Sequence, residues 1–300
     1  TAGSVPGALE AGTAARIFTG AEVPPGADTV VMQEHTEGDD SCVRILQLPR
    51  LGANIRPRGQ DISSGQTVLR CGHKLRSQDL GLAASLGFHR VAAYRPLKVA
   101  VLSTGDELVE PGDNAGPGQI YNSNRYTLSA QLSAWGFDVV DMGIVRDDPV
   151  AVRQAMMRAA EAADVLITSG GVSVGEEDHV RDVVAALGSI DLWRIAIKPG
   201  KPFAFGNVMG KPFIGLPGNP VSVFVTFLIF ARPLILKMQG ADSFRANELS
   251  IRSGFEWKGI KRQEYLRVRV RHDESGAYAE IYPQQGSGVL SSASLSLIHI

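Results

Sequence analysis

Between residues 97 and 240 the sequence alternates short apolar runs with longer segments of helical periodicity, and this alternation restricts the fold more than any other feature. Strands that alternate with helices form a parallel sheet covered on both faces. The sequence therefore predicts an α/β fold with a doubly wound, mostly parallel sheet. Strands are expected at residues 99–102, 137–142, 165–168, 192–197, 203–205 and 213–216. Helices are expected at residues 124–135, 149–163, 179–187 and 220 to about 240, with Ser123 and either Asp147 or Asp148 as N-caps.

The segments on either side of this domain have short β-type runs separated by turns rich in glycine and proline. A connector between the first segment and this domain carries one helix, capped by Ser77 or Asp79 and ending near Leu86. Outer strands are expected at residues 16–18, 29–32, 43–48, 265–271 and 278–282. We expect an incomplete β-rich, lid-like domain at 1–65, a connecting portion at 66–96, the α/β domain at 97–240 and an incomplete β-rich C-terminal domain at 241–300.

The composition and the spacing of particular residues disfavour several classes of protein. A net charge of −1 argues against a broad nucleic-acid or membrane surface. The apolar run at residues 221–236 is interrupted by Arg232 and Pro233, so we expect a buried helix. Cys42 and Cys71 lack ligand-type spacing, and the six histidines are scattered, which disfavours a zinc site. With no secretory leader in the sequence, we expect a cytoplasmic protein with reduced thiols.

Ligands of doubly wound sheets bind at the carboxyl ends of the strands, so the loops that leave those ends are the candidate functional segments. Their acids and glycines are the densest in the chain, and they predict a functional crevice. The loops lie at residues 104–107, 143–148, 169–178 and 216–220.

A glycine-serine loop follows the expected strand 165–168 and reads SGGVSVGEED over residues 169–178. Bare backbone N–H groups in such a loop can hold a phosphate, since no Cβ prevents close approach. The acids Glu176, Glu177 and Asp178 could hold a metal ion against that phosphate. The alternative is an ordinary strand-to-helix connection that needs glycine for its turn.

Three further groups have both a functional and a plain interpretation. Asp106 and Glu107 directly follow a strand and suit Mg²⁺, although acids also favour a helix start. Lys198 and Lys201 lie three residues apart in a stiff KPGKP turn that suits an oxyanion or is a solvated hairpin. Strand alternation places Arg267 on a polar, solvent-exposed face with its neighbours Arg269 and Arg271. Motifs for a Rossmann dinucleotide site, a P-loop or a nucleophile elbow are absent from the sequence.

Six motifs in a fixed order resemble the molybdopterin molybdenumtransferase family, which includes the bacterial MoeA type and matching domains of plant and animal proteins such as gephyrin. They are STGDEL (103–108), GQIYNSN (118–124), GIVRDD (143–148), SGGVSVGEEDH (169–179), AIKPGKPFAFG (196–206) and GLPGNPVS (215–222). The resemblance runs from about residue 11 to residue 292, with further matches at RIFTGAEVP (16–24) and RGQDI (58–62). It implies the last step of molybdenum cofactor synthesis. In that step molybdate is inserted into adenylylated molybdopterin, and the adenylate bond is hydrolysed with Mg²⁺.

The resemblance also implies roles residue by residue. The pterin phosphate would be held by Gly170, Gly171, Ser173 and Gly175. The acids that bind metal or are needed for activity would be Glu107, Asp147 and Asp178, with the choice between Asp147 and Asp148 left open. Thr19 and Asp61 would reach into the cleft from the lid domain. The oxyanion site would comprise Lys198, Lys201 and Ser222, a loop shaped by Pro217 and Pro220, and Arg267 with Ser287 near the molybdate.

The chain departs from the family at both ends. The family's first segment carries an asparagine-serine-alanine-methionine-aspartate-glycine motif, which this sequence lacks, and the final SASLSLIHI does not match. We therefore expect a fragment, and from the family a homodimer that could meet other cofactor-synthesis enzymes. The main alternative is a non-catalytic pterin-binding or scaffold protein of the same fold. A dinucleotide oxidoreductase is a third possibility and would require tight NAD binding.

Overall fold

A computed structural model of the chain describes residues 2–39, 41–172 and 179–294. The chain divides into two compact units, residues 1–70 and residues 71–300. The candidate crevice loops all belong to the second unit.

The first unit consists mainly of turns and extended segments. Its regular elements are the 3₁₀ turn η1 (Gln33–His35) and a hairpin of β1 (Thr36–Gly38) and β2 (Val43–Ile45). The strand expected at 43–48 is confirmed only over its first three residues. The strands expected at 16–18 and 29–32 are wrong, because these segments pair with no described strand. Extended backbone without a ladder partner is not a strand.

The second unit is built on a six-stranded sheet with the order β6-β3-β7-β11-β10-β8. The strands are β3 (Lys98–Thr104), β6 (Asp138–Val145), β7 (Val165–Ser169), β8 (Gly188–Trp193), β10 (Ala204–Val208) and β11 (Lys211–Leu216). The pairs from β6 through β3 and β7 to β11 are parallel. β10 alone runs antiparallel to both neighbours, so the sheet is mixed.

The reversal of β10 has a local cause in the turn that joins it to β11. Met209 and Gly210 form this two-residue connection with φ values of +50° and +80°. Positive φ at both positions matches the turn that suits a tight hairpin, and such a hairpin can join only antiparallel strands. The expected strands at 203–205 and 213–216 are confirmed, and this turn sets their relative direction.

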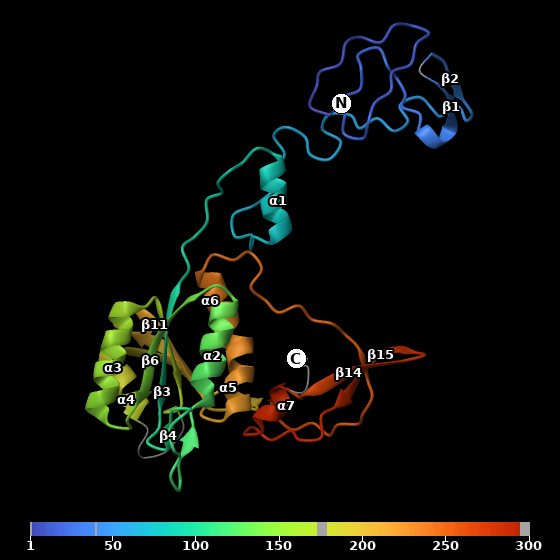
Figure 1. Ribbon diagram of the computed structural model, residues 1–300. Coiled ribbons are helices and arrows are strands. Elements are labelled where there is room, and N and C mark those ends of the chain that lie inside the picture. Colours follow the sequence, from blue (N-terminus) through green and yellow to red (C-terminus); the bar gives the residue numbers. More distant parts are fainter. Residues whose placement is uncertain (1, 40, 173–178, 295–300) are drawn as a thin grey trace. The chain divides into compact units, whose positions relative to one another are not determined.

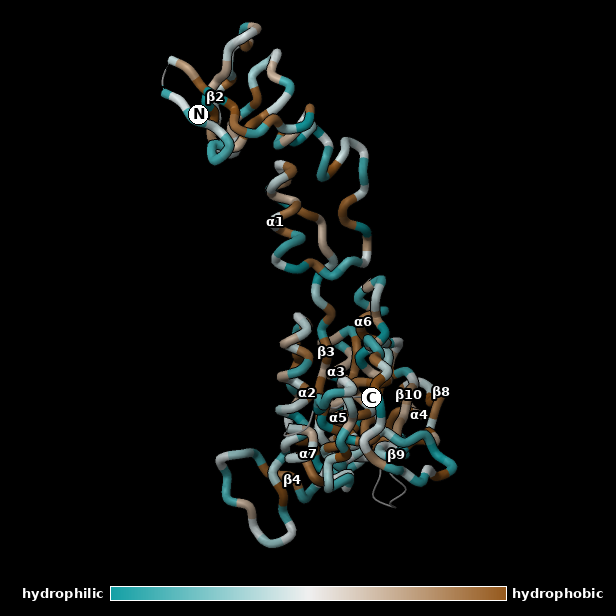
Figure 2. The backbone as a smooth tube through the Cα atoms, turned by 90° about the vertical axis from the view of Figure 1, so that its right-hand side faces the viewer, coloured by the Kyte–Doolittle hydropathy of each residue, from teal (hydrophilic) through white to brown (hydrophobic). Residues whose placement is uncertain are grey.

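Helices cover both faces of the sheet, as the doubly wound prediction requires (Figure 1). Strand alternation sends Ala100 and Leu102 to one face of β3, and Val99 and Val101 to the other. The first face packs against α3 (Pro149–Ala162) and α4 (His179–Leu187). The second packs against α2 (Ser123–Ala134), α5 (Pro220–Thr226), the π-helical turn η2 (Phe227–Ala231) and α6 (Arg232–Met238). Figure 2 shows hydrophobic residues in these strands and helices.

The segment Pro220–Met238 is long and apolar enough, by length and composition, to cross a membrane. Val223, Phe227, Ala231 and Ile235 are nevertheless fully buried against the sheet. A spacing of four residues places them on one side of the helix, which is the pattern of a core helix. The prediction of a buried helix is confirmed.

Two helix starts show which sequence signals act as caps. Asn122, not Ser123, caps α2, because its side-chain oxygen accepts from the backbone N–H of Arg125. Asp148, with Pro149 following it, caps α3 through the N–H of Ala151 at 2.8 Å. In the connector, α1 (Ser77–Ser85) starts after Arg76, so neither Ser77 nor Asp79 is its N-cap.

The remaining elements of the described residues are two short strand pairs, a three-stranded sheet and a final helix. β4 (Leu108–Val109) and β5 (Ile120–Tyr121) pair at the base of a loop that projects from the sheet edge (Figures 1 and 2). β9 (Ile197–Lys198) pairs with β13 (Gln263–Glu264) of the C-terminal segment. A three-stranded sheet of β12 (Arg252–Ser253), β15 (Gly276–Ile281) and β14 (Val268–Asp273) follows, and then α7 (Leu290–Ser294).

Candidate functional site

The carboxyl ends of β3, β6, β7 and β11 meet at one edge of the sheet, since these strands are parallel neighbours. Trp193 at the end of β8 pairs with Ala204 at the start of β10, and Ala204 pairs with Gly215 near the end of β11. The segment between β8 and β10, which carries both lysines, therefore returns to the same edge. The topology brings the described parts of the four predicted loops and the lysine turn to this edge.

The described part of the glycine loop lies tightly against its neighbours. Gly170 and Gly171 have φ values of +88° and +66°. A Cβ at Gly170 would lie 2.5 Å from the carbonyl oxygen of Thr104, and one at Gly171 only 2.4 Å from Cγ2 of Val180. Both glycines are thus required for packing, whether or not they also hold a phosphate. Ser173, Gly175 and Asp178 lie outside the described residues.

Acidic side chains gather where β3 and β6 end. The backbone N–H of Asp147 donates to Oδ1 of Asp106 at 3.2 Å. Burial, and then the charges of Asp106 and Glu107, raise the pKa of Asp147. Asp148 instead uses its carboxylate to cap α3. Geometry therefore favours Asp147 over Asp148 as the acid available to a ligand.

The acids are close, but they do not form a complete metal site by themselves. In the described ranges no group of three His, Cys, Asp or Glu residues is arranged to hold a metal ion. An open pocket of about 530 Å³ adjoins Asp106 and extends along the β4 loop past Glu110 to Arg146. Space for a polar ligand therefore lies beside the acids.

Buried polar side chains lie beneath the crevice, at the ends of β3 and β7. The hydroxyl groups of Ser103 and Ser169 are 2.9 Å apart, and Ser103 also donates to Oδ1 of Asn122 at 3.3 Å. Within the described residues, the Nδ2 group of Asn122 and the hydroxyls of Thr104 and Thr168 are buried without a hydrogen-bond partner. A buried polar group without a partner requires an explanation, and a bound ligand or water would supply one. Thr104 and Asn122 lie in the motifs STGDEL and GQIYNSN, whereas Thr168 was expected only as part of a strand.

The cationic side of the crevice contains lysines in two different states. Nζ of Lys198 lies 3.0 Å from Oε1 of Glu264, a carboxylate only 8% exposed. Hydrogen bonds from Trp257 and then Lys198 lower the pKa of Glu264. Lys201 is exposed, and no ion pair to it is found among the described residues. Lys201 is therefore the lysine more available to an anion.

Arg267 is not on an exposed strand face, which corrects the sequence-based expectation. β14 begins only at Val268, and the Arg267 side chain turns inward, where the residue is 1% exposed. Its guanidinium donates to the carbonyl oxygens of Gln284 and Gly286 at 3.2 and 3.0 Å, and to the hydroxyl of Ser292 at 3.1 Å. Burial lowers the pKa of Arg267.

The C-terminal segment reaches the crevice through Ser287. Its carbonyl accepts from the N–H of Val221 at 3.0 Å, and its hydroxyl accepts from the side chain of Asn219 at 3.1 Å. Ser222 is buried in the first turn of α5, next to this contact. Nδ2 of Asn124 donates to the carbonyl of Gly218 at 2.7 Å, which ties α2 to the loop between Pro217 and Pro220.

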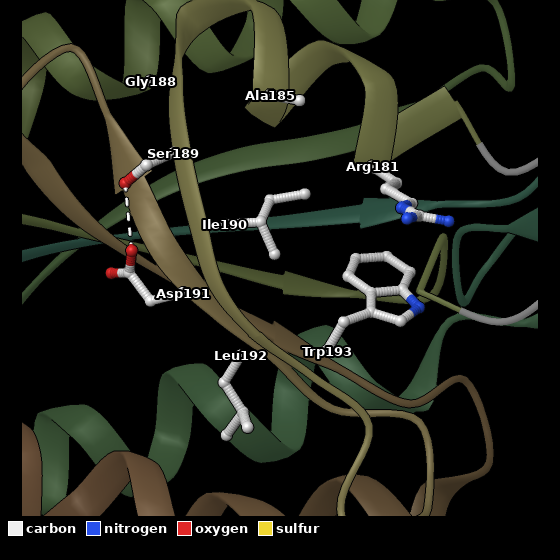
Figure 3. A pocket seen from close by; sticks show the side chains of 8 residues that line it. All are labelled: Arg181, Ala185, Gly188, Ser189, Ile190, Asp191, Leu192 and Trp193. Atoms are coloured by element: carbon white, nitrogen blue, oxygen red, sulfur yellow. Dashed lines mark hydrogen bonds between the residues drawn. The ribbon is translucent and has the colours of Figure 1, made fainter.

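Thr19 and Asp61 belong to the first unit and are exposed there. Their reach into the crevice stays a prediction. A second open pocket of about 460 Å³ is lined by α4 and β8, with Arg181 lying over the ring of Trp193 (Figure 3). It contains no predicted site residue.

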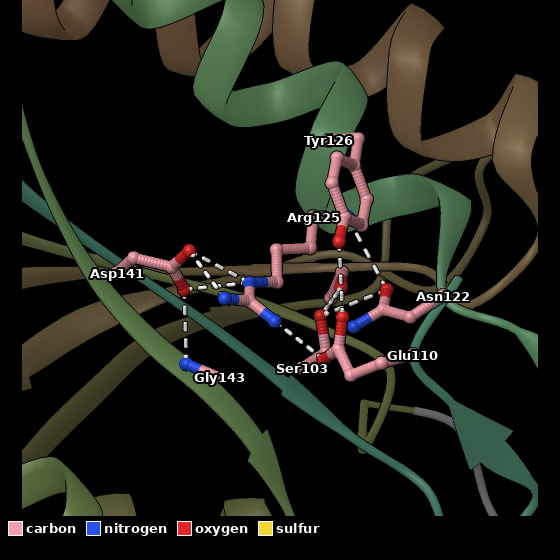
Figure 4. A network of polar contacts seen from close by, with 8 residues as sticks. Ser103, Glu110, Asn122, Arg125, Tyr126, Asp141 and Gly143 are labelled. Carbon is pink, nitrogen blue, oxygen red and sulfur yellow. Dashed lines mark hydrogen bonds and ion pairs between the residues drawn. The ribbon is translucent and has the colours of Figure 1, made fainter. Parts of the chain in front are cut away.

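A network of charged groups on α2 adjoins the acids (Figure 4). Arg125 contacts Asp141 of β6 and Glu110 of the β4 loop. These contacts, the hydrogen bond to Asp141 first, raise the pKa of Arg125. No sequence motif indicated this network, because its members come from three separate segments.

This fold, with a polar crevice at the carboxyl edge of a doubly wound sheet, is that of an α/β protein that binds a small ligand. The family model described as "Probable molybdopterin binding domain" matches residues 100–237. The family model for the MoeA N-terminal region (domain I and II) matches residues 1–87. The family model for the MoeA C-terminal region (domain IV) matches residues 251–296. The chain belongs to the molybdopterin molybdenumtransferase family.

Relatives and solved structures agree with this assignment. A molybdopterin molybdenumtransferase of Haemophilus influenzae is 47% identical over 234 residues, 78% of this chain and 58% of the relative. One from Nostoc is 40% identical over 264 residues, 86% of this chain and 61% of the relative. The MoeA protein of Pyrococcus horikosii has a TM-score of 0.73 and 31% identity, over 96% of this chain and 73% of that one. The chain thus spans about three fifths of the length of these first two relatives.

Proposed function

We propose that this chain inserts molybdate into adenylylated molybdopterin with release of AMP, the final step of molybdenum cofactor synthesis. The observation that carries the proposal is the placement of an acidic group and a cationic group at one sheet edge. The acidic group consists of Asp106, Glu107 and Asp147. The cationic group consists of Lys201 and the segment that contains Arg267. The relatives named molybdopterin molybdenumtransferase support the same reaction.

The acidic group suits a divalent cation by its chemistry. Its donors are carboxylate oxygens, the ligands that Mg²⁺ prefers, and burial followed by the charges of Asp106 and Glu107 raises the pKa of Asp147. Glu107, Asp147 and Asp178 would hold Mg²⁺ together with phosphate oxygens of the substrate. Bound there, Mg²⁺ would neutralise charge on the phosphates.

The chain's own residues supply binding and orientation. The glycine loop and the buried donors Thr104 and Asn122 would receive the pterin phosphate region at the ends of β3 and β7. Lys201, together with Lys198, would attract molybdate, a tetrahedral dianion. Arg267 supports the cationic side of the crevice. Its guanidinium binds the carbonyls of Gln284 and Gly286, and this places Ser287 against α5.

The decisive experiment incubates the 300-residue chain with adenylylated molybdopterin, Mg²⁺ and molybdate, and measures AMP by chromatography. AMP release that requires molybdate and is lost in Asp147→Asn supports the proposal. Asp148→Asn is the matched control, since asparagine caps a helix about as well as aspartate. Saturable pterin binding without AMP release would instead favour the scaffold alternative.

Three further expectations also stay predictions. A homodimer would show twice the chain mass in light scattering, and a monomer mass would contradict it. Contact with other cofactor-synthesis enzymes and a cytoplasmic location need measurements on the cell.

A further inference from the structure

Arg125 joins two segments that carry the candidate acids. Its Nε lies 2.7 Å from both carboxylate oxygens of Asp141, and Nη2 lies 2.6 Å from Oδ2 of the same group. Nη1 donates to Oε1 of Glu110 (Figure 4). The arginine side chain is 22% exposed, so much of this contact is shielded from solvent. One guanidinium therefore links α2, β6 and the β4 loop.

Asp141 lies where β6 departs from regular pairing. Asp141 pairs with Val101 and Gly143 with Leu102, so Met142 is an extra residue in the strand. Oδ1 of Asp141 accepts from the N–H of Gly143 at 3.0 Å, and Gly143 has a φ of +73°. Such a bulge bends the strand and redirects the residues that follow it. The Asp141 side chain thus sets the course of the segment that leads to Asp147.

Glu110 fixes the other acidic loop. Its Oε2 accepts from the hydroxyl of Tyr126 at 3.2 Å, so two neighbouring residues of α2 hold one carboxylate. Glu110 lies three residues after Glu107, and the carbonyl of Glu107 accepts from the N–H of Ile120 at 2.8 Å. The backbone of Glu107 is thereby held from within its own loop, and the loop is held to the helix.

The backbone of Arg125 extends the network to the glycine loop. Its N–H donates to Oδ1 of Asn122, the atom that also accepts from Ser103. Ser103 contacts Ser169, the residue directly before Gly170. One short stretch of α2 is therefore in contact with the bases of all three acid- and glycine-bearing loops.

We propose that Arg125 is a positioning residue of the candidate site, which holds the Glu107 and Asp147 segments in fixed relation by pairing with Glu110 and Asp141. The proposal rests on the proposed function. A planar, doubly hydrogen-bonded guanidinium fixes geometry better than a single ammonium does. Small displacements of reacting groups cost large factors in rate, so loss of this link acts on turnover more than on folding.

The test compares Arg125→Gln with Arg95→Gln in the same chain. Arg95 forms a similar two-point pair with Asp164, at 2.8 and 2.9 Å, but at the opposite edge of the sheet beside the start of β3. We expect Arg125→Gln to lower kcat for AMP release about tenfold or more with little change in KM, and Arg95→Gln to leave both within about twofold. The kcat of Arg125→Lys should lie between those of the unaltered chain and Arg125→Gln, since lysine keeps the positive charge and loses the planar, two-point hydrogen bonding.

Two more readouts separate positioning from plain stabilisation. Hydrogen exchange should rise at residues 105–110 and 143–148 in Arg125→Gln and not in Arg95→Gln. Glu110→Gln should add little to Arg125→Gln, because both remove the same link. Unchanged exchange in these loops, an unchanged kcat, or an equal loss of kcat in Arg95→Gln would overturn the proposal.

Failure of the proposed function is recognised separately. If the unaltered chain binds adenylylated molybdopterin and releases no AMP, the assigned reaction is wrong. The exchange measurement, which needs no substrate, still decides whether Arg125 holds the two loops together.

Discussion

The N–H of Asp147 donates to Oδ1 of Asp106 across 41 residues of sequence, and this contact joins the ends of β3 and β6. Burial, followed by the nearby negative charges of Asp106 and Glu107, raises the pKa of Asp147. The next residue, Asp148, only caps a helix. Two adjacent aspartates therefore make different contacts, which the sequence alone left open.

Asp147→Asn should stabilise the protein at neutral pH while abolishing AMP release. A raised folded-state pKa means that ionised Asp147 destabilises the folded state, and this effect is full above that pKa. The stabilisation should shrink as the pH falls toward the ordinary value of 3.8, where aspartate gains a proton in either state. Thermal melting at a series of pH values checks this, and a gain independent of pH would contradict it.

Asp164→Asn should have the opposite pH dependence. The hydrogen bond from Arg95 lowers the pKa of Asp164 from 3.8 to about 2. A lowered pKa contributes stability that is complete above 3.8 and disappears as the pH falls toward 2. We expect a loss of about 1 kcal/mol at neutral pH, since Arg95 is 67% exposed and solvent screens the pair.

Urea unfolding of the Asp164 variant and the unaltered chain gives this difference. It should diminish when salt is added or the pH is lowered. A difference that is constant down to the lowest pH would show that packing, not charge, is responsible.

Arg267→Lys should destabilise the C-terminal segment by about 1–3 kcal/mol, because lysine cannot serve both carbonyls and the hydroxyl that the guanidinium reaches. Arg269→Lys is the control. Arg269 is half-buried two residues further along and lies over the ring of Tyr282 at 5.1 Å. There we expect a change below about 0.5 kcal/mol. Denaturant unfolding compares the two, and similar losses would show that burial of Arg267 does not matter.

Gly171→Ala should cost more stability than Gly118→Ala. Both glycines have positive φ, +66° and +82°, so alanine is strained at either position. Only Gly171 also meets neighbours, with Val180 Cγ2 at 2.4 Å and Thr104 Oγ1 at 2.6 Å from an added Cβ. We expect about 1 kcal/mol at Gly118 and a further 1–3 kcal/mol at Gly171. Equal melting temperatures for the two variants would refute the packing argument.

Patterns of hydrophobic residues predicted the α/β domain because burial acts locally on each strand and helix. Residues such as Val101 and Ile167 need only a buried strand, and the sequence indicates that directly. The antiparallel direction of β10 depends on a two-residue turn. The strands expected near Phe18 and Val30 do not form, because a strand needs a partner elsewhere in the chain.

The parts of the candidate site whose residues directly follow strands were predicted from the sequence. The parts whose positions depend on tertiary contacts were missed. Arg267 looked exposed by alternation, yet its guanidinium is buried and bonds to the segment 284–292, which alternation within one strand cannot indicate. Arg125, Glu110 and Asp141 share no spacing, so only the folded chain brings them together.

The tight turn at Met209–Gly210 is a suitable place to attach a spectroscopic probe. It connects the ends of β10 and β11 that lie away from the crevice, and Met209 is 45% exposed. A fluorophore can be attached there through a cysteine that replaces Met209, once the exposed free cysteines Cys42 and Cys71 have been changed to serine, and it would report on the sheet from a position away from the ligand. Binding and loop motion can then be followed in the unmodified crevice.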